Sequence, residues 1–187
     1  MPNETDQLDP AGEIRAILDR TTALGWKPET TSGATPDQIE RFVSEQGATS
    51  IPAALHEVYR LVGQNPGLWV AGSTFGVIDT GKRLKLEATS LLEDTDVDPS
   101  GALVMTGHGG YEYQFIPGHL TDASNPPVWM AREADDEDED ETNPVVEVWP
   151  SVVAWFEFQA AEVLRWRETL AARPGSGDEL VAKYFSR

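Results

Sequence analysis

The spacing of apolar residues predicts a helix near the beginning of the chain. Ile14, Ile17 and Leu18 fall on one face of a helical repeat. Asp9 stands before a proline, which is the arrangement of an N-cap followed by the first helical residue, and Gly25 ends the run. We therefore expect a polar lead, this helix, and a polar connector that ends at residue 33.

Two more helices are expected before residue 64. Thr35 is a good N-cap, and Gln38 completes a capping box with it three residues later. Apolar residues at helical spacing follow this start. The next helix opens at Ile51-Pro52, carries a stripe of apolar side chains and closes at Gly63.

The middle of the chain changes to the period of a β-sheet. Residues 68–78 are rich in aromatic and β-branched types, which predicts one or two strands, and residues 84–92 suit a short helix. Two strand-like runs, 102–106 and 111–116, flank the sequence Gly107-His-Gly-Gly110. A glycine-rich turn between alternating runs predicts a β-hairpin.

The remaining third predicts two strands and a long helix. Residues 128–132 and 145–149 have strand character. Ser151 starts a helix that runs to about residue 173, and a proline-glycine breaker separates it from a short docked or frayed tail. The predicted organisation is an N-terminal helix with its connector at 1–33, a main domain at 34–173, and a tail at 174–187.

Composition is that of an ordinary globular protein. The chain has 187 residues, of which 40% are hydrophobic and 9% aromatic, enough to fill the core of one domain. No apolar run is long enough to span a membrane, and the polar, acidic start does not resemble a secretory signal. We therefore expect a cytoplasmic protein. Cysteine is absent, which excludes disulfides, thiolate nucleophiles and sulfur-ligated zinc.

A strong negative charge restricts the kinds of partner. The formal net charge is -18. Such a surface repels the phosphates of nucleic acids and the anionic headgroups of membranes, and it attracts basic proteins. We expect a basic protein partner, and neither nucleic acid nor membrane.

Much of this acidity lies between the two predicted strands 128–132 and 145–149. All residues from 133 to 141 except Ala134 are acidic, namely Glu133, Asp135, Asp136, Glu137, Asp138, Glu139, Asp140 and Glu141. Like charges at this density repel one another, so we expect a solvated loop. Because the loop interrupts a strand pair, its ends should be held together, and the charge should be presented from one defined surface.

The histidines and glycine-rich segments do not match catalytic motifs. His56, His108 and His119 have no Glu or His at metal-binding spacing. The glycine-rich hairpin turn lacks the lysine and hydroxyl residue of a phosphate loop. Near Ser73 the serine stands one position away from its place in the G-x-S-x-G motif of a nucleophile elbow. We therefore expect no catalytic residues and no cofactor.

The requirements of a calcium loop are met only in part. Asp94, Asp96 and Asp98 occupy the first, third and fifth positions of such a loop. Pro99 and Met105, however, stand where the turn glycine and the bidentate glutamate are required. We expect no dedicated metal site.

Three segments carry a family resemblance. The first is 36–61, where a helix ending in Gly47 is followed by Ile51-Pro52 and a second helix. The second is the hairpin at 103–116, and the third is 145–158, a strand that leads into a helix. Across residues 35–170 the chain resembles the SUKH superfamily, which includes the fungal regulator of cell-wall glucan synthesis and many bacterial immunity proteins.

The resemblance implies both a fold and a function. The implied fold is a single α+β domain with a mostly antiparallel sheet and helices packed beside it. The implied function is that of an immunity protein, which binds and neutralises a cognate toxin, often a nuclease. The family has no known catalytic residues, so none are carried over. A regulatory adaptor that binds an endogenous protein is the alternative, and the sequence leaves both open.

The predicted binding site combines the acidic loop with aromatic anchors. The acidic residues would face a basic groove of the partner. Tyr111, Tyr113, Trp69 and Trp129 are the candidate anchors, because a few aromatic residues often carry most of the binding energy. Alternation places Tyr111, Tyr113 and Phe115 on one face of their strand. Core packing is the alternative for all four candidates, and the usual burial of aromatic side chains favours it.

Overall fold

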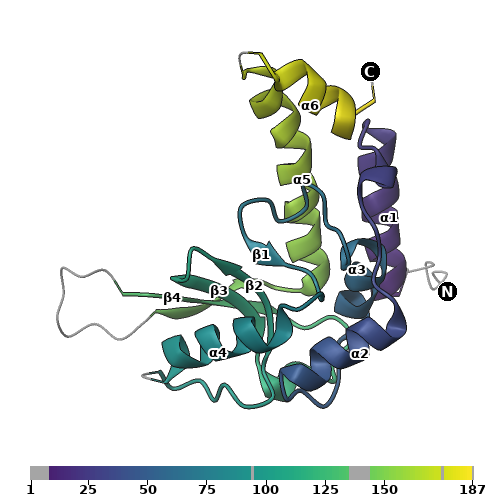
Figure 1. Ribbon diagram of the computed structural model, residues 1–187. Coiled ribbons are helices and arrows are strands. Elements are labelled where there is room, and N and C mark those ends of the chain that lie inside the picture. Colours follow the sequence, from purple (N-terminus) through teal and green to yellow (C-terminus); the bar gives the residue numbers. More distant parts are fainter. Residues whose placement is uncertain (1–8, 94, 135–143, 174, 187) are drawn as a thin grey trace, which may run out of the picture.

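The computed structural model describes residues 9–93, 95–134, 144–173 and 175–186 (Figure 1). The fold is α+β, as expected. No helix within these ranges is long and apolar enough to cross a lipid bilayer. The elements, which include the short 3-10 helices η1 and η2, are α1 Pro10–Ala23, η1 Pro28–Thr30, α2 Pro36–Glu45, α3 Ala53–Val62, β1 Thr74–Phe75, α4 Gly81–Leu92, β2 Leu103–His108, β3 Glu112–Ile116, η2 Gly118–Leu120, β4 Val128–Arg132, β5 Val145–Trp149, α5 Val152–Ala171 and α6 Gly177–Tyr184.

The first three helices begin where the capping signals place them. The Asp9 carboxylate accepts a 2.6 Å hydrogen bond from an amide in the first turn of α1. At α2, the Gln38 amide donates to Thr35 Oγ1 at 3.3 Å, and the Thr35 amide donates to Gln38 Oε1 at 2.8 Å. The predicted capping box is therefore confirmed. α3 begins directly after Pro52, as the sequence indicated.

Within the described residues, five antiparallel strands form one sheet in the order β1-β2-β3-β4-β5, so each strand pairs with its neighbour along the chain. β4 and β5 have the predicted bounds. The predicted hairpin is confirmed, with His108 of β2 opposite Glu112 of β3. Its turn is shorter than expected and contains Gly109 and Gly110, whose φ angles of 60° and 86° glycine adopts without strain.

Residues 68–78 differ from the prediction of one or two strands, because only Thr74–Phe75 is extended and paired. Val70 has a φ of 54° and Gly76 a φ of 103°, which interrupt an extended conformation. The aromatic character of the segment serves the core instead. Trp69 is buried and stacks on Phe156 of α5 with the ring centroids 4.5 Å apart. Tertiary packing has overridden local strand propensity here.

Helices cover both faces of the sheet. On one face, α4 lies so close that a Cβ on Gly107 of β2 would be 2.9 Å from Leu84. On the other face, Trp155 Nε1 of α5 donates to Gln114 Oε1 of β3 at 2.9 Å. α4 and α5 therefore lie on opposite sides of the sheet (Figure 1). α4 begins at Gly81, three residues before the predicted start.

The C-terminal half of α5 extends past the sheet and stands beside α1, with α6 across its end (Figure 1). Phe185, which follows α6, is buried and meets the Trp26 ring edge-on at 5.6 Å. The Lys27 amide donates to the Tyr184 carbonyl oxygen at 2.9 Å. The C-terminal tail is thus a docked helix, and its contacts tie it to the connector that follows α1.

Candidate functional site

The acidic segment is attached to the sheet where β4 ends and β5 begins. The Arg132 amide donates to the Pro144 carbonyl oxygen at 3.1 Å, and the Glu133 amide donates to the Tyr111 carbonyl oxygen at 2.8 Å. The Glu133 side chain is exposed. The other predicted acidic site residues, 135–141, lie outside the described residues. The described chain thus leaves and re-enters the sheet at adjacent points.

Tyr111 is an exposed aromatic residue next to this attachment point, with 43% of its surface accessible. It lies in the turn, one residue before β3, whereas the predicted strand began at Tyr111. Its ring meets the His108 ring edge-on at 5.4 Å, and His108 Nδ1 lies 3.2 Å from Ser73 Oγ. These contacts hold Tyr111 beside Glu133.

Tyr113 and Trp69 are core residues, which corrects their candidacy as surface anchors. Each is 1% exposed. The Tyr113 hydroxyl donates to Glu87 Oε2 of α4 at 3.1 Å. Burial, together with this carboxylate, raises the pKa of Tyr113 to about 12. Neither side chain offers surface to a partner, because the helices on each face of the sheet cover them.

Trp129, the remaining candidate anchor, lines a cavity of about 500 Å³ near the start of β4. The loop after α4 contributes Asp96 and Val97, and the turn after β3 contributes Pro117 and His119. Trp129 is half-buried, whereas Asp96 and His119 are exposed. The structure therefore does not bring Trp129 together with Tyr111; they lie at opposite ends of the neighbouring strands β3 and β4.

The rim of this cavity carries negative charge. Asp98 accepts from the Ser100 amide at 2.8 Å and from the Ser100 hydroxyl at 2.6 Å, and these hydrogen bonds lower the pKa of Asp98. Lys85 binds the same loop through the carbonyl oxygens of Pro99 and Ala102. An apolar wall with a carboxylate rim fits a long aliphatic side chain that ends in a positive charge.

The described ranges show no group of three or more His, Asp or Glu side chains placed to hold a metal ion. Of the three aspartates that partly matched a calcium loop, Asp94 lies outside the described residues. Asp98 is already engaged by Ser100. The described part of the loop places the carboxylates of Asp96 and Asp98 at the rim of the cavity.

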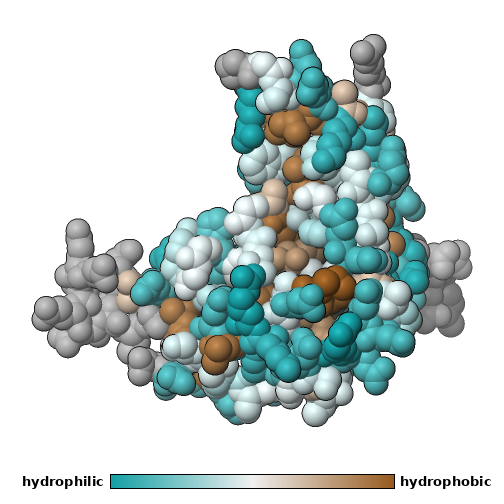
Figure 2. Space-filling model, in the orientation of Figure 1, coloured by the Kyte–Doolittle hydropathy of each residue, from teal (hydrophilic) through white to brown (hydrophobic). Residues whose placement is uncertain are grey.

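Charge is divided unevenly along the chain. Residues 86–164 contain 18 of the 32 acidic residues and a single basic residue, Arg132, whereas the remainder has 14 acidic and 13 basic residues. The first group covers most of α4, strands β2 to β5 and most of α5. Hydrophilic residues dominate the face seen in Figure 2, where apolar residues form small separate spots. Residues 86–164 are therefore strongly acidic and are called the acidic half of the chain, whereas the other residues together are nearly neutral.

The Ser73–His108 pair resembles a nucleophile and its base, and no sequence motif indicates it because the two residues are 35 positions apart. A general base also needs a group that orients the imidazole. Among the described residues, no carboxylate is hydrogen-bonded to His108. In this structure the His108 ring of the pair packs edge-on against Tyr111.

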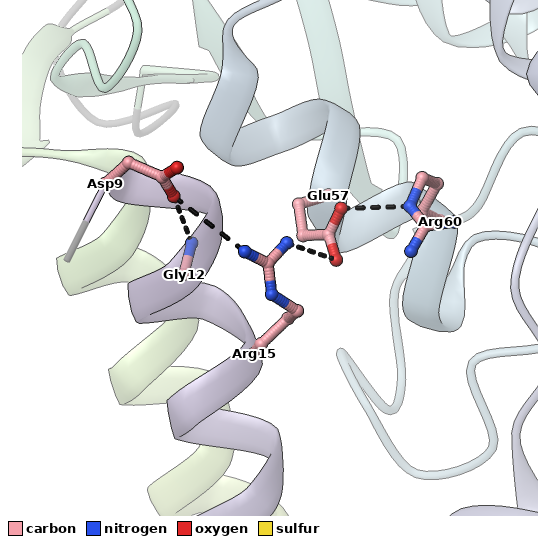
Figure 3. A network of polar contacts seen from close by, with 5 residues as sticks. All are labelled: Asp9, Gly12, Arg15, Glu57 and Arg60. Carbon is pink, nitrogen blue, oxygen red and sulfur yellow. Dashed lines mark hydrogen bonds and ion pairs between the residues drawn. The ribbon is translucent and has the colours of Figure 1, made fainter.

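Glu57 of α3 is a buried carboxylate that joins two helices. Its Oε1 lies 3.2 Å from Arg15 Nη1 of α1, and its Oε2 accepts from Arg60 Nε at 2.9 Å (Figure 3). Burial acts to raise the pKa of Glu57, but the two arginines outweigh it, so that pKa lies below its ordinary value. A carboxylate held ionised in this way is suited to structure and not to proton transfer.

The outer edge of β5 is a surface that the sequence did not predict. β5 is last in the sheet order, and no other strand of the described chain pairs with its outer side. Val146 is 46% exposed, and Phe158 of α5, 46% exposed, lies 5.7 Å from the Trp149 ring. The sequence feature that could have predicted this open edge is a run of β-branched residues in the last strand of the sheet.

Comparisons with protein-family models, with curated proteins and with solved structures find no match to the chain. The resemblance to the SUKH superfamily therefore stays a prediction from the sequence. Function is inferred from three features of the molecule: its acidic half, its exposed aromatic residues and the open edge of its sheet.

Proposed function

We propose that the chain is a non-enzymatic, cytoplasmic protein-binding protein, and that it acts as an immunity protein by occluding a basic toxin domain. The observation that carries the proposal is the division of charge. Residues 86–164 have a formal charge of -17 out of the total of -18. A field of this kind raises the encounter rate with a basic partner by roughly 10 to 1,000-fold at low salt and turns one half of the molecule toward it.

Charge and aromatic contact have separate tasks in the proposed complex. Complementary charge mainly sets the association rate and the choice of partner. Affinity comes mostly from a few desolvated aromatic side chains. Tyr111, beside the acidic segment, and Trp129, in the cavity with the acidic rim, are two of the exposed or half-exposed aromatic residues of this half.

A nucleic-acid cleft is the kind of basic groove that fits these features. Lysine and arginine side chains line such clefts because they hold phosphates. Glu133 and the acidic residues at 135–141 would compete for the same side chains. The SUKH resemblance supports an immunity function, and a regulatory adaptor with a basic endogenous partner is the alternative.

Growth rescue distinguishes these two functions. Each candidate toxin domain found in the genes that flank this one is expressed in a sensitive cell with or without the chain. We expect the chain to restore growth and to bind the toxin domain directly in a pull-down from the producing cell. Restored growth without direct binding would contradict occlusion. Capture of a basic endogenous protein, with no rescue from any neighbouring toxin, would support the adaptor instead.

A further inference from the structure

The hydrogen-bond alternation of β5 shows which of its backbone groups face outward. In an antiparallel pair, successive residues direct their backbone groups alternately toward the partner strand and away from it. The Arg132 amide bonds to the Pro144 carbonyl oxygen, and Val145 and Val146 follow in register with β4. The backbone groups of Val146 therefore face β4, whereas those of Val145 and Glu147 face the open edge.

The side chains along this edge differ on the two faces of the sheet. Val146 lies opposite Met130 on the α5 face, where Trp149 and Phe158 add apolar surface. Glu147 lies opposite Trp129 on the α4 face, the face of the cavity with the acidic rim. A strand added here would meet apolar surface on one side and negative charge on the other.

We propose that the edge of β5 binds a short extended segment of a basic protein, in which apolar and basic residues alternate, as a sixth strand of the sheet. Such strand addition takes its affinity from backbone hydrogen bonds and its specificity from the alternating side chains. The apolar residues of the segment pack over Val146 and Phe158. The basic residues lie on the face of Glu147, within the half of the chain that has a formal charge of -17.

A second copy of the chain is a poor occupant of the edge. Pairing two β5 strands would bring two Glu147 side chains and two strongly acidic halves together, and like charges at a strand pair are unfavourable. The register shift near Val148 also limits the edge to a short regular stretch. These two features favour a short basic segment over a long self-complementary strand.

The first test uses the intact protein and a synthetic peptide of alternating valine and lysine. Two control peptides have the same charge: one gathers the lysines in a block, and one carries N-methyl groups on the amides that would face β5. We expect each control to bind at least about 10-fold more weakly than the alternating peptide, a loss that corresponds to about 1.4 kcal/mol. Equal binding of the N-methylated peptide would overturn the proposal.

The second test changes the protein. Glu147→Pro removes an outward amide and keeps the hydrogen bonds to β4, whereas Glu147→Gln removes the charge and keeps the amide. We expect Glu147→Pro to weaken binding of the alternating peptide at least about 10-fold and Glu147→Gln no more than about 3-fold. Hydrogen exchange at the Val145 and Glu147 amides of the unaltered protein should slow on binding. Equal effects of the two variants, or exchange unchanged by the peptide, would overturn it.

The inference rests on the proposed function for the nature of the partner, and the two can fail separately. If the captured basic partner binds Glu147→Pro as tightly as the unaltered chain, the edge is not the site although the basic partner stands. If the alternating peptide binds at the edge but no basic partner is captured, strand addition stands and the proposed function fails. A dimer in solution that the peptide does not disrupt would assign the edge to a second copy and overturn the inference.

Discussion

The backbone amide of Glu133 donates a 2.8 Å hydrogen bond to the carbonyl oxygen of Tyr111. This bond joins the end of β4 to the turn between β2 and β3. It places an exposed aromatic ring beside the first residue of the acidic segment. Negative charge and an aromatic contact surface therefore meet at one end of the sheet, a combination suited to fast and selective binding of a basic partner.

Removing charge from the acidic segment should slow association. We expect replacement of Asp135, Asp136, Asp138 and Asp140 by Asn to lower the association rate with the captured partner by about 10-fold at low salt and to flatten its salt dependence. Folding should stay intact, because like-charge repulsion is relieved. Stopped-flow measurements at two ionic strengths give both quantities.

The matched control removes the same charge from the nearly neutral half. Asp19, Glu29, Glu40 and Glu168 are exposed and can be replaced by their amides. We expect this variant to associate almost as fast as the unaltered chain. If both variants slow association equally, total charge matters and its placement does not. Unchanged rates in both would remove the electrostatic contribution altogether.

The two tyrosines of the β2–β3 hairpin should separate binding from stability. Tyr111→Ala should weaken partner binding by about 2 kcal/mol and change the free energy of unfolding by no more than about 0.5 kcal/mol. Tyr113→Ala should destabilise the fold by about 3–5 kcal/mol, because it empties a buried ring site. Calorimetric titration and denaturant unfolding measure the two effects. Full affinity in Tyr111→Ala would take that residue out of the interface.

Loss of the Glu57 charge should loosen the contact between α1 and α3. Glu57→Gln leaves Arg15 and Arg60 without their buried partner, and we expect the free energy of unfolding to fall by about 1–3 kcal/mol. Both arginines are half-exposed, so water takes over much of their solvation. Denaturant unfolding at neutral pH measures the loss, and an unchanged midpoint would show that the network contributes no net stability.

The same glutamate predicts a pH dependence with a defined sign. The pKa of Glu57 is lowered in the folded state from the ordinary value of 4.5. The contribution of the ionised Glu57 side chain to stability is therefore complete above about pH 4.5. It is lost as the pH falls through the lower pKa that Glu57 has in the folded state. The stability difference between the unaltered chain and Glu57→Gln should shrink in that acid range. A difference that stays constant from pH 7 to pH 3 would contradict the lowered pKa.

Close packing of α4 on the sheet should make Gly107 intolerant of a side chain. A Cβ at this position would lie 2.8 Å from the Tyr113 ring and 2.9 Å from Leu84. We expect Gly107→Ala to cost about 1–3 kcal/mol. In the double variant with Leu84→Ala, the cost of the added methyl should become smaller, because the leucine side chain no longer occupies the space. Strictly additive losses would show that the leucine does not cause the strain.

Much of the local structure was predictable because its signals lie within a few residues. The capping pair Thr35 and Gln38, the prolines before the helices and the paired glycines of the hairpin act on their immediate neighbours. The bounds of β4 and β5 were predicted for the same reason, since alternation and flanking polar residues mark them. The α+β class expected from the family resemblance is likewise the class observed.

The candidate site was predictable only in part. The acidic run is visible in the sequence, and so is the strand pair that holds it. Whether an aromatic residue lies on the surface depends on which helix covers each face of the sheet. Tyr111 and Tyr113 are two residues apart, yet one is exposed in a turn and the other is buried under α4.

The sequence by itself determined the charge of the molecule, the starts of α1, α2, α3 and α5, and the β2–β3 hairpin, because these depend on composition and on neighbours in the chain. The tertiary structure alone decided contacts between distant residues. The buried side chain of Gln46 both donates to and accepts from the backbone of Val104, at 2.9 and 2.7 Å, although 58 positions separate them. Trp69 became a core residue and the edge of β5 stayed open for the same physical reason: burial is set by what the folded chain packs against each side chain, and no local pattern encodes that.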